Sequence, residues 1–302
     1  MSDELPMQCR KVVVGGVGLI GGSFIRALKA SEQGAAMHFV AMGRSRASLE
    51  QALAAGVVDA IGDDWASALD GADFVLLGAP VGAATAMLTA MQPHLQAQTV
   101  ISDVGSTKGD VVAAARAALG VGAAQFVPAH PIAGAEQSGV AAARADLFVD
   151  RRVVLTPLPE NQPPAVALVT ALWRLCGARV CEMNHAAHDN LFAAVSHLPH
   201  LLAFTLVNEF AGRNNADELF SFAAGGFRDF TRIASSHPEM WRDICVANRR
   251  ALIRELDVYM EELLRARVML AAADGDALER MFDNARSRRN AWLQGATEAA
   301  PQ

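Results

Sequence analysis

Two short segments place a serine and a histidine where a fold could bring them together. The first reads Asp-Val-Gly-Ser-Thr-Lys over Asp103–Lys108, and the second reads His-Pro-Ile-Ala-Gly-Ala-Glu over His130–Glu136. Each follows an apolar run that predicts a β-strand, and ligands bind at the carboxyl ends of parallel strands. Ser106 and His130 can therefore share a hydrogen bond at a binding site. The alternative is a loop histidine satisfied by its own neighbours.

A group of imidazoles and a carboxylate lies further along the chain. Five such residues fall within sixteen positions: His185, His188, Asp189, His197 and His200. At about 100° per residue, Asp189 and His200 share nearly one helix face, and His197 lies about a quarter-turn away. Pro199 is placed to kink that helix. The pairs lack the Cys or His-Glu-x-x-His context of a zinc site, so we expect no metal.

Two arginines lie four residues apart in the segment Gly225–Arg232, which reads Gly-Gly-Phe-Arg-Asp-Phe-Thr-Arg. Arg228 and Arg232 would share a helix face. One interpretation is a solvated face with ion pairs to Asp229. In an acidic protein, an arginine left over in a cleft would instead bind an anionic ligand through its planar fork of donors.

A glycine-rich loop follows the first predicted strand, since residues 12–23 read V-V-V-G-G-V-G-L-I-G-G-S. Gly16, Gly18 and Gly21 form the pattern G-x-G-x-x-G at the start of a helix. The first glycine permits a tight turn, the second lets the backbone approach a pyrophosphate, and the third allows close helix–strand packing. The loop predicts a dinucleotide site, at which Ser106 and His130 would face the nicotinamide.

The residues after the second predicted strand bear on the choice of cofactor. An NAD site has an acidic residue about 20 positions past the glycines, which binds the ribose 2′-hydroxyl. Here Gly43 is followed by Arg44 and Ser45. A guanidinium and a hydroxyl suit a 2′-phosphate. We therefore expect NADP to be preferred, with NAD as a second cofactor.

The elements that would position these residues alternate along the first half of the chain. Apolar runs bounded by Gly, Asp, Ser or Pro predict strands over Lys11–Val14, His38–Ala41, Phe74–Leu77, Thr99–Ser102, Gln125–Pro128, Arg152–Thr156 and Arg179–Glu182. Most of these runs are separated by helical patterns. Such alternation predicts an α/β fold with a Rossmann-type doubly wound parallel sheet.

The second half reads as helices only. Apolar residues at three- and four-residue spacing predict helices over His185–Gly212, Asp217–Phe222, Met240–Ala271 and Gly275–Leu293. We expect a dinucleotide-binding domain over 1–183 and an all-helical substrate and dimerisation domain over 184–302. The apolar stripes of long helices must be buried, which predicts a homodimer through the C-terminal helices.

Composition excludes several other classes of protein. Hydrophobic residues make up 52% of the 302 residues, and the net charge of −6 disfavours a nucleic-acid-binding surface. Four cysteines without a C-x-x-C pair favour reduced thiols in a cytoplasm. The N-terminus lacks the apolar run of a signal peptide. The uncharged stretch Phe74–Ser102 contains Pro80, Pro93 and His94, so we expect no membrane span.

Five segments, taken together, resemble the prephenate dehydrogenase family, which includes the arogenate and cyclohexadienyl dehydrogenases. They are Gly16–Ser23, Asp103–Lys108, His130–Glu136, Ser196–His200 and Gly225–Ala234. The resemblance runs in the family's order from Lys11 to Trp241. It departs at two points: the acid after the second strand is missing, and Ala135 stands where threonine is common. We expect neither a chorismate mutase domain nor an ACT regulatory domain.

The resemblance implies oxidative decarboxylation of prephenate to 4-hydroxyphenylpyruvate, a step of tyrosine biosynthesis. Hydride would leave C4 of the cyclohexadienyl ring for the nicotinamide, the 4-hydroxyl proton would go to a base, and the ring carboxylate would depart as CO2. His130 is implied as that base. Ser106 is implied to orient His130 or the hydroxyl, and Arg232 to bind a substrate carboxylate.

Further site residues follow from the same resemblance. The substrate pocket is expected to include His197, His200 and Gly225, with Trp241 as a cap. Ion pairs of Glu136, Asp189 and Asp229 are expected to hold the site together. The cofactor is expected to contact nine residues: Gly16, Gly18, Leu19, Ile20, Gly21, Arg44, Ser45, Ala79 and Asp103.

Three alternatives stay open. Arogenate, with an amino group in place of the keto group, would give tyrosine directly. A 3-hydroxyacid or 6-phosphogluconate type of dehydrogenase needs a catalytic lysine in its helical domain, but no lysine follows Lys108 in this chain. A non-catalytic regulator that senses NADP would not need His130, Ser106 and Arg232 together.

Overall fold

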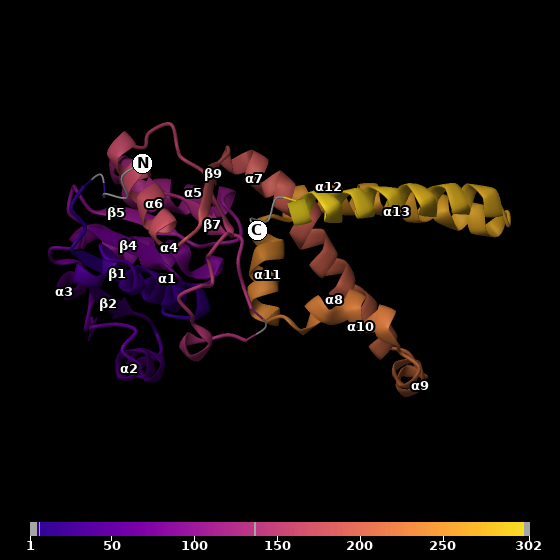
Figure 1. Cartoon of the computed structure of the whole chain (residues 1–302), viewed down its shortest axis with the longest axis horizontal. Helices are drawn as coiled ribbons and strands as arrows, with labels where there is room; N and C mark the ends of the chain where they lie inside the picture. Colours follow the sequence, from indigo (N-terminus) through magenta and orange to yellow (C-terminus); the bar gives the residue numbers. More distant parts are fainter. Residues whose placement is uncertain (1–4, 6, 136, 299–302) are drawn as a thin grey trace. The chain divides into compact units, whose positions relative to one another are not determined.

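A parallel six-stranded sheet forms the first part of the computed structural model, which describes residue 5, residues 7–135 and residues 137–298. Its strands lie in the order β3-β2-β1-β4-β5-β6 (Figure 1). They are β1 (Lys11–Gly15), β2 (His38–Met42), β3 (Ala60–Ile61), β4 (Phe74–Leu77), β5 (Val100–Asp103) and β6 (Phe126–Val127). The strand order reverses between β1 and β4, and a doubly wound sheet binds its ligand beside that point. The predicted fold class is confirmed.

Helices cover both faces of this sheet because its strands are apolar on both sides. In β1, Val12 and Val14 join one hydrophobic core and Val13 joins the other. The first core includes Phe24 and Trp173, whose rings lie 4.8 Å apart. Complete burial of one such side chain contributes about 1.5–3 kcal/mol. The first core is covered by α1 (Leu19–Ala30), α2 (Arg46–Ala54) and α6 (Pro163–Leu175), and the second by α3 (Trp65–Leu69), α4 (Ala84–Met91) and α5 (Gly109–Leu119).

A second, three-stranded sheet holds the segment that contains His130. It consists of β7 (Ala129–Pro131), β8 (Arg152–Leu155) and β9 (Arg179–Glu182), with β7 antiparallel to β8 and β8 parallel to β9. The sequence predicts β8 and β9 but places His130 in a loop after a strand. In the structure His130 pairs with Val154 within the sheet. Pro128 separates β6 from β7, since it has no N–H for either ladder.

Short 3-10 turns connect several of these elements. They are η1 (Gly34–Ala36), η2 (Val81–Ala83), η3 (Gln92–His94), η4 (Gly120–Gln125) and η5 (Val140–Ala142).

The predicted helix over His185–Gly212 is continuous but not uniform. It consists of α7 (His185–Phe192), a five-residue π-helix η6 (Ala193–His197) and α8 (Leu198–Ala211). Pro199 lies in the first turn of α8. Because proline has no N–H to donate to the preceding turn, the wider π hydrogen-bonding pattern accommodates it. The sequence predicts a proline kink, and the structure shows a π segment in its place.

Shorter helices follow, most of which pack on α8. They are α9 (Ala216–Ser221), α10 (Gly225–Thr231), the 3-10 turn η7 (Arg232–Ser235) and α11 (Pro238–Ala247). Helix α7 packs against α5, and α11 packs against η2. A Cβ added at Gly82 in η2 would lie 2.6 Å from a carboxylate oxygen of Asp243 in α11, so glycine permits this close approach.

The chain divides into two compact units, Met1–Leu252 and Ile253–Gln302. Helix α12 (Arg249–Ala271) spans the division, and α13 (Gly275–Glu298) lies in the second unit. The predicted domain boundary near residue 183 falls inside the first unit, because α7 and α11 pack on elements of the sheet domain. That boundary stays a prediction.

One helical stretch among the described residues, His185–Ala211, is long and apolar enough to cross a membrane by those two criteria. A core helix of a globular protein meets the same criteria. The stretch carries His188, Asp189, His197 and His200, and the expectation of no membrane span stays a prediction.

Candidate active site

The parallel sheet brings three loops together at its carboxyl edge. The Gly16 N–H donates to the Met42 carbonyl at 2.7 Å, and the Gly78 N–H donates to the Gly15 carbonyl at 2.8 Å. The Val104 N–H donates to the Leu77 carbonyl at 3.2 Å. The glycine loop, the loop before Ala79 and the loop after β5 are therefore neighbours, as the sequence predicts.

The glycine loop has the geometry that a pyrophosphate requires. Gly16 has φ +98°, and a Cβ there would lie 2.8 Å from the Ala79 nitrogen. A Cβ at Gly21 would lie 2.6 Å from the Gly16 carbonyl oxygen, whereas one at Gly18 would meet nothing within 4 Å. Gly18 is the N-cap of α1, whose first turn begins with Leu19 and Ile20. The open space before the helix N-terminus fits an anionic diphosphate.

The residues after β2 remain available to a ligand. Arg44 is exposed, and among the described residues no hydrogen bond or ion pair to it is seen. Ser45 is the N-cap of α2 and accepts a hydrogen bond from the Ser48 N–H at 3.3 Å. The Ser45 hydroxyl still has its own proton to donate, as a 2′-phosphate would require.

Asp103 is held within the protein, and its expected contact with a cofactor stays a prediction. Its carboxylate forms an ion pair with the wholly buried Lys108 and accepts hydrogen bonds from the Gly105 and Ala129 N–H groups at 2.8 and 3.1 Å. The Lys108 ammonium also donates to the Ala129 carbonyl at 2.7 Å. With these partners, the Asp103 carboxylate fixes the loop after β5 to β7, directly before His130.

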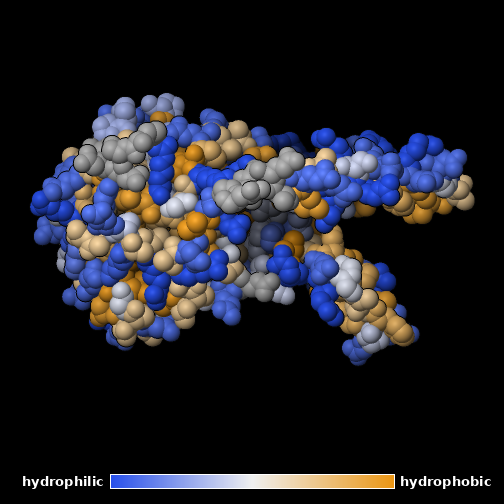
Figure 2. Space-filling view, in the orientation of Figure 1, coloured by the Kyte–Doolittle hydropathy of each residue, from blue (hydrophilic) through white to orange (hydrophobic). Residues whose placement is uncertain are grey.

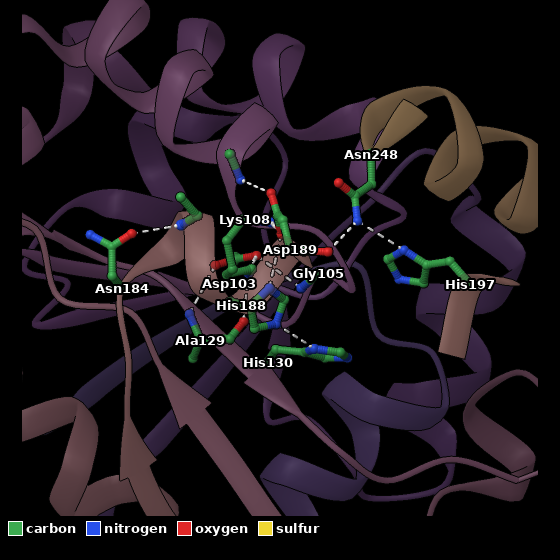
Figure 3. A network of polar contacts seen from close by, with 12 residues as sticks. Asp103, Gly105, Lys108, Ala129, His130, Asn184, His188, Asp189, His197 and Asn248 are labelled. Carbon is green, nitrogen blue, oxygen red and sulfur yellow. Dashed lines mark hydrogen bonds and ion pairs between the residues drawn. The ribbon is translucent and has the colours of Figure 1, made fainter. Parts of the chain in front are cut away.

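His130 is buried and hydrogen-bonded to another histidine. Its Nδ1 lies 2.8 Å from Nε2 of His188 in α7 (Figure 3). Burial lowers the pKa of His130 well below 6.5, and the nearby His188, Lys108 and His197 lower it further. The imidazole is therefore neutral at pH 7 and can accept a proton. The partner of His130 is His188 rather than the expected Ser106, whose role toward a substrate hydroxyl stays a prediction.

Asp189, in α7, contacts both His188 and the N-terminus of α5. Its Oδ1 lies 2.9 Å from His188 Nδ1 and 2.8 Å from the Lys108 backbone nitrogen, and its Oδ2 lies 2.8 Å from the Gly109 nitrogen. Burial acts to raise the pKa of Asp189, but these hydrogen bonds outweigh it and the pKa is lowered. The ionised carboxylate satisfies two free N–H groups at a helix N-terminus, where negative charge is favourable.

His197 takes its orientation from Asn248, at the junction of α11 and α12. The Asn248 amide nitrogen lies 2.7 Å from the Asp189 carbonyl and 3.1 Å from His197 Nδ1. Since a carbonyl only accepts, the amide group donates to both, and His197 carries its proton on Nε2. Burial lowers the pKa of His197 to about 4. Its Nε2 is buried and makes no hydrogen bond of normal geometry among the described residues, although the Ser106 backbone lies near enough to favour the protonated ring.

His200 and Trp241 stack on each other. Their rings are stacked with centroids 3.6 Å apart, and Trp241 is buried. The His200 Nδ1–H donates to the Ser196 carbonyl at 2.9 Å. Burial lowers the pKa of His200, and the positive charge of Arg232 contributes to this lowering. His200, Trp241 and Arg232 therefore lie near one another, and their role toward a substrate stays a prediction.

The remaining predicted residues lie on the surface or outside the described part. Gly225 begins α10 and is exposed, as are Arg228 and Arg232. Asp229 is exposed, no ion pair to it is seen among the described residues, and its expected supporting role stays a prediction. Glu136 lies outside the described residues. No group of three or more metal-ligating side chains is found in the part that the structure describes.

Sequence reasoning misses three members of this site. His188 belongs to the histidine group that the sequence singles out, but its spacing alone does not reveal its contact with His130. Lys108 ends the Asp103–Lys108 segment, but the sequence does not reveal that this lysine is completely buried. Asn248 lies in a helical region without a local motif, so only the folded chain brings it to His197.

Two models of known families match consecutive parts of the chain. Residues 25–182 match the prephenate dehydrogenase nucleotide-binding domain, and residues 184–284 match the prephenate dehydrogenase dimerization domain. Among curated proteins, the cyclohexadienyl dehydrogenase of Zymomonas mobilis is 34% identical and covers 93% of this chain and 95% of its own length. The prephenate dehydrogenase of Bacillus subtilis is 36% identical over 92% of this chain and 75% of its own.

Solved structures give the same result. The prephenate dehydrogenase of Aquifex aeolicus, in complex with hydroxyphenyl propionate and NAD+, has a TM-score of 0.87 at 31% identity and covers 94% of this chain and 99% of its own. The arogenate dehydrogenase of Synechocystis has a TM-score of 0.78 at 27% identity, over 93% of this chain and 99% of its own. With this fold and this site, the chain belongs to the prephenate dehydrogenase family and is an NAD(P)-dependent oxidoreductase.

Proposed function

We propose that this dehydrogenase oxidises prephenate to 4-hydroxyphenylpyruvate with loss of CO2. The observation that carries the proposal is a buried, neutral His130 directly after Ala129, whose N–H is hydrogen-bonded to Asp103 at the carboxyl end of β5. A neutral imidazole accepts the proton of an alcohol that is being oxidised. The relatives from Bacillus subtilis and Aquifex aeolicus, both called prephenate dehydrogenases, support this choice of substrate.

The side chains around His130 suit a cyclohexadienyl dianion. The bound nicotinamide would supply the acceptor for the hydride that leaves C4. His130 would accept the 4-hydroxyl proton as the hydride leaves, and the product phenol would recover it when CO2 departs. Arg232 would bind a substrate carboxylate, and the flat His200–Trp241 stack would contact the ring. The His197 Nε2–H would donate to a substrate oxygen in place of its weak contact with the Ser106 backbone.

A comparison of two substrates tests this proposal. Purified protein is incubated with prephenate or arogenate and either cofactor, while reduced nicotinamide and the aromatic product are followed. We expect turnover with prephenate to give 4-hydroxyphenylpyruvate. A higher kcat/KM with arogenate would establish the arogenate alternative. Cofactor binding without turnover of either substrate would instead indicate a regulator.

NADP is proposed as the preferred cofactor. Its support is the exposed Arg44 beside the Ser45 hydroxyl, where many NAD sites carry an acid. Arg44→Asp should lower kcat/KM with NADP and raise it with NAD, because a carboxylate repels the 2′-phosphate. The matched control is Arg46→Asp two residues further on. Equal kcat/KM for both cofactors in the wild type would contradict the preference.

A cytoplasmic homodimer completes the proposal. The matched dimerization domain supports it, as do exposed apolar residues on the last two helices, including Val258, Leu264, Val268, Leu270 and Trp292. Figure 2 shows apolar side chains gathered along part of the α12–α13 pair. Sedimentation at micromolar concentration should give a mass about twice 31.9 kDa. A monomer at that concentration would contradict it.

A further inference from the structure

We propose that His188 and Asp189 are positioning residues that act on the reaction through His130. In this proposal they hold its ring in the one tautomer that leaves Nε2 free to take the substrate proton. The inference rests on the proposed function, because it assigns a role in the same reaction. Figure 3 shows the three side chains in sequence, with Asp189 behind His188 and His188 behind His130.

The proton positions on His188 and His130 follow from the hydrogen bonds of Asp189. The Asp189 carboxylate receives the backbone N–H groups of Lys108 and Gly109 at 2.8 Å each, so it is held ionised and can only accept. His188 Nδ1, at 2.9 Å from Oδ1, must therefore be the protonated nitrogen. In a neutral ring this leaves a lone pair on His188 Nε2.

The same reasoning fixes the ring of His130. Its Nδ1 lies 2.8 Å from the His188 Nε2 lone pair, so Nδ1 carries the proton and donates it. The opposite tautomer would set two lone pairs against each other at that distance. The lone pair of His130 is consequently on Nε2, the nitrogen that points away from His188. A carboxylate that fixes an imidazole tautomer in this way is a recurring device of enzymes with a histidine base.

Beyond the hydrogen bonds just described, the neighbours seen around the two rings are largely apolar. His188 is completely buried, and Phe192 packs against both imidazoles with ring centroids 4.8 Å from His130 and 4.5 Å from His188. The position of Asp189 is equally constrained. A Cβ at Gly109 would lie 2.9 Å from its Oδ2, so glycine there permits the carboxylate to reach the backbone.

The charges that face these rings come from three elements. Lys108 precedes α5 and faces both rings, and it is paired with Asp103 at the end of β5. His197 faces His130 from η6, and it is neutral above pH 4 for the reason given above. The Lys108 ammonium contacts the Asp103 carboxylate, so neither ring is the direct ion-pair partner of Lys108, and we assign the tautomer from the hydrogen bonds.

Removal of both nitrogens of His188 tests the proposal. His188→Leu should lower kcat by roughly 10²- to 10⁴-fold, the range for loss of general-base catalysis, because His130 then populates the wrong tautomer. KM for prephenate and the Kd of the cofactor should stay within about threefold, since neither nitrogen would contact them. His188→Gln keeps an oxygen that can accept from His130 and should restore part of kcat. The control is His185→Leu on the same helix, which should keep wild-type kcat.

Two further measurements separate positioning from a structural role. In the His130→Asn background, His188→Leu should cost nothing more, because its effect passes through His130. Nitrogen-15 NMR of labelled histidine should show His130 protonated at Nδ1 in the wild type and at Nε2 in His188→Leu. An equal loss of kcat in both backgrounds, or an unchanged His130 tautomer in His188→Leu, would overturn the proposal.

The NMR signal also separates this proposal from the function on which it rests. If the wild type shows no turnover of prephenate or arogenate, the proposed function fails. The wild-type spectrum still reports the His130 tautomer in that case, and a proton on Nε2 would overturn the positioning role independently.

Discussion

At the scale of single residues, the site is built from neutral imidazoles whose proton positions are set by their neighbours. Asn248 sets the proton position of His197, just as Asp189 and His188 set the proton position of His130. In each case a group that can only accept, a carbonyl or a carboxylate, removes the ambiguity. The site therefore presents one lone pair and one N–H donor to the ligand without any net charge on the two rings.

Asn248→Leu should weaken substrate binding without abolishing chemistry. The variant loses the amide that holds His197 with its proton on Nε2, so this donor is no longer fixed. Loss of one such hydrogen bond corresponds to a rise in KM for prephenate of roughly 3- to 10-fold. Asn208→Leu on the exposed face of α8 serves as the control. A fall in kcat with unchanged KM would show that Asn248 serves the chemical step instead.

Arg232→Ala should raise KM for prephenate by roughly 10- to 150-fold, because a charged hydrogen bond to a substrate carboxylate is lost. KM for the cofactor and the melting temperature should hardly change, since Arg232 is exposed at the start of η7. Arg228→Ala, four residues earlier, is the matched control. If Arg228→Ala raises KM and Arg232→Ala does not, the two roles are exchanged.

At the scale of elements, the π-helix η6 sets the rotation between the two halves of the histidine-bearing helix. Residues before it carry His188 and Asp189, and residues after it carry His200. One residue advances a helix by about 100°, so the wider π turn decides which of these side chains face the same pocket.

Deletion of Val195 should convert η6 to α-helix and abolish turnover. Val195 is 62% exposed, so its own side chain contributes little packing. The deletion rotates His200 by about 100° relative to Asp189, which breaks the alignment of the site. Circular dichroism should show unchanged helix content, and Val195→Ala should keep activity. Normal turnover of the deletion variant would show that the π segment is dispensable.

The parallel sheet could be predicted from the sequence because its strands are continuous apolar runs bounded by Gly, Asp and Ser. The glycine loop could be predicted for the same reason, since its spacing reflects local geometry. Strand β7 could not, because a three-residue strand containing His130 and Pro131 has no alternation of its own. The π segment could not be predicted either, because it depends on how Pro199 is accommodated in a helix that is stabilised by tertiary packing.

The hydrogen bonds around His130 could not be predicted from local sequence because they join residues that are far apart in the chain. Lys108 and Asp189 are 81 positions apart, and Asp189 and Asn248 are 59 apart. Their hydrogen bonds exist only because α7 packs on α5 and α11 packs on η2. Motifs indicate candidate ligand-binding residues, whereas the residues that orient them are found only in the folded chain.

At the scale of the whole molecule, buried neutral histidines make stability depend on pH. His197 has a pKa of about 4 in the fold against 6.5 when unfolded. Between these values the unfolded chain binds a proton that the folded chain does not, so the free energy of unfolding falls as pH falls. The contribution of His197 is fully present above pH 6.5, and about 3 kcal/mol of it is lost by pH 4.

Urea unfolding at several pH values between 7 and 4 tests this dependence. His197→Gln should show a smaller loss of stability over that window than the wild type, because it removes one titrating group. The exposed His38, substituted in the same way, is the control. Parallel curves for His197→Gln and the wild type would contradict the buried, neutral state of His197.

The central claim is that a neutral His130 takes the proton of the substrate hydroxyl, and His130→Asn tests it most directly. Asparagine keeps a polar side chain but offers no imidazole lone pair, so cofactor Kd should stay unchanged while kcat with prephenate falls by roughly 10²- to 10⁴-fold. Single-turnover formation of reduced nicotinamide measures the chemical step itself. A His130→Asn variant that turns over prephenate at close to the wild-type rate at neutral pH would contradict the account.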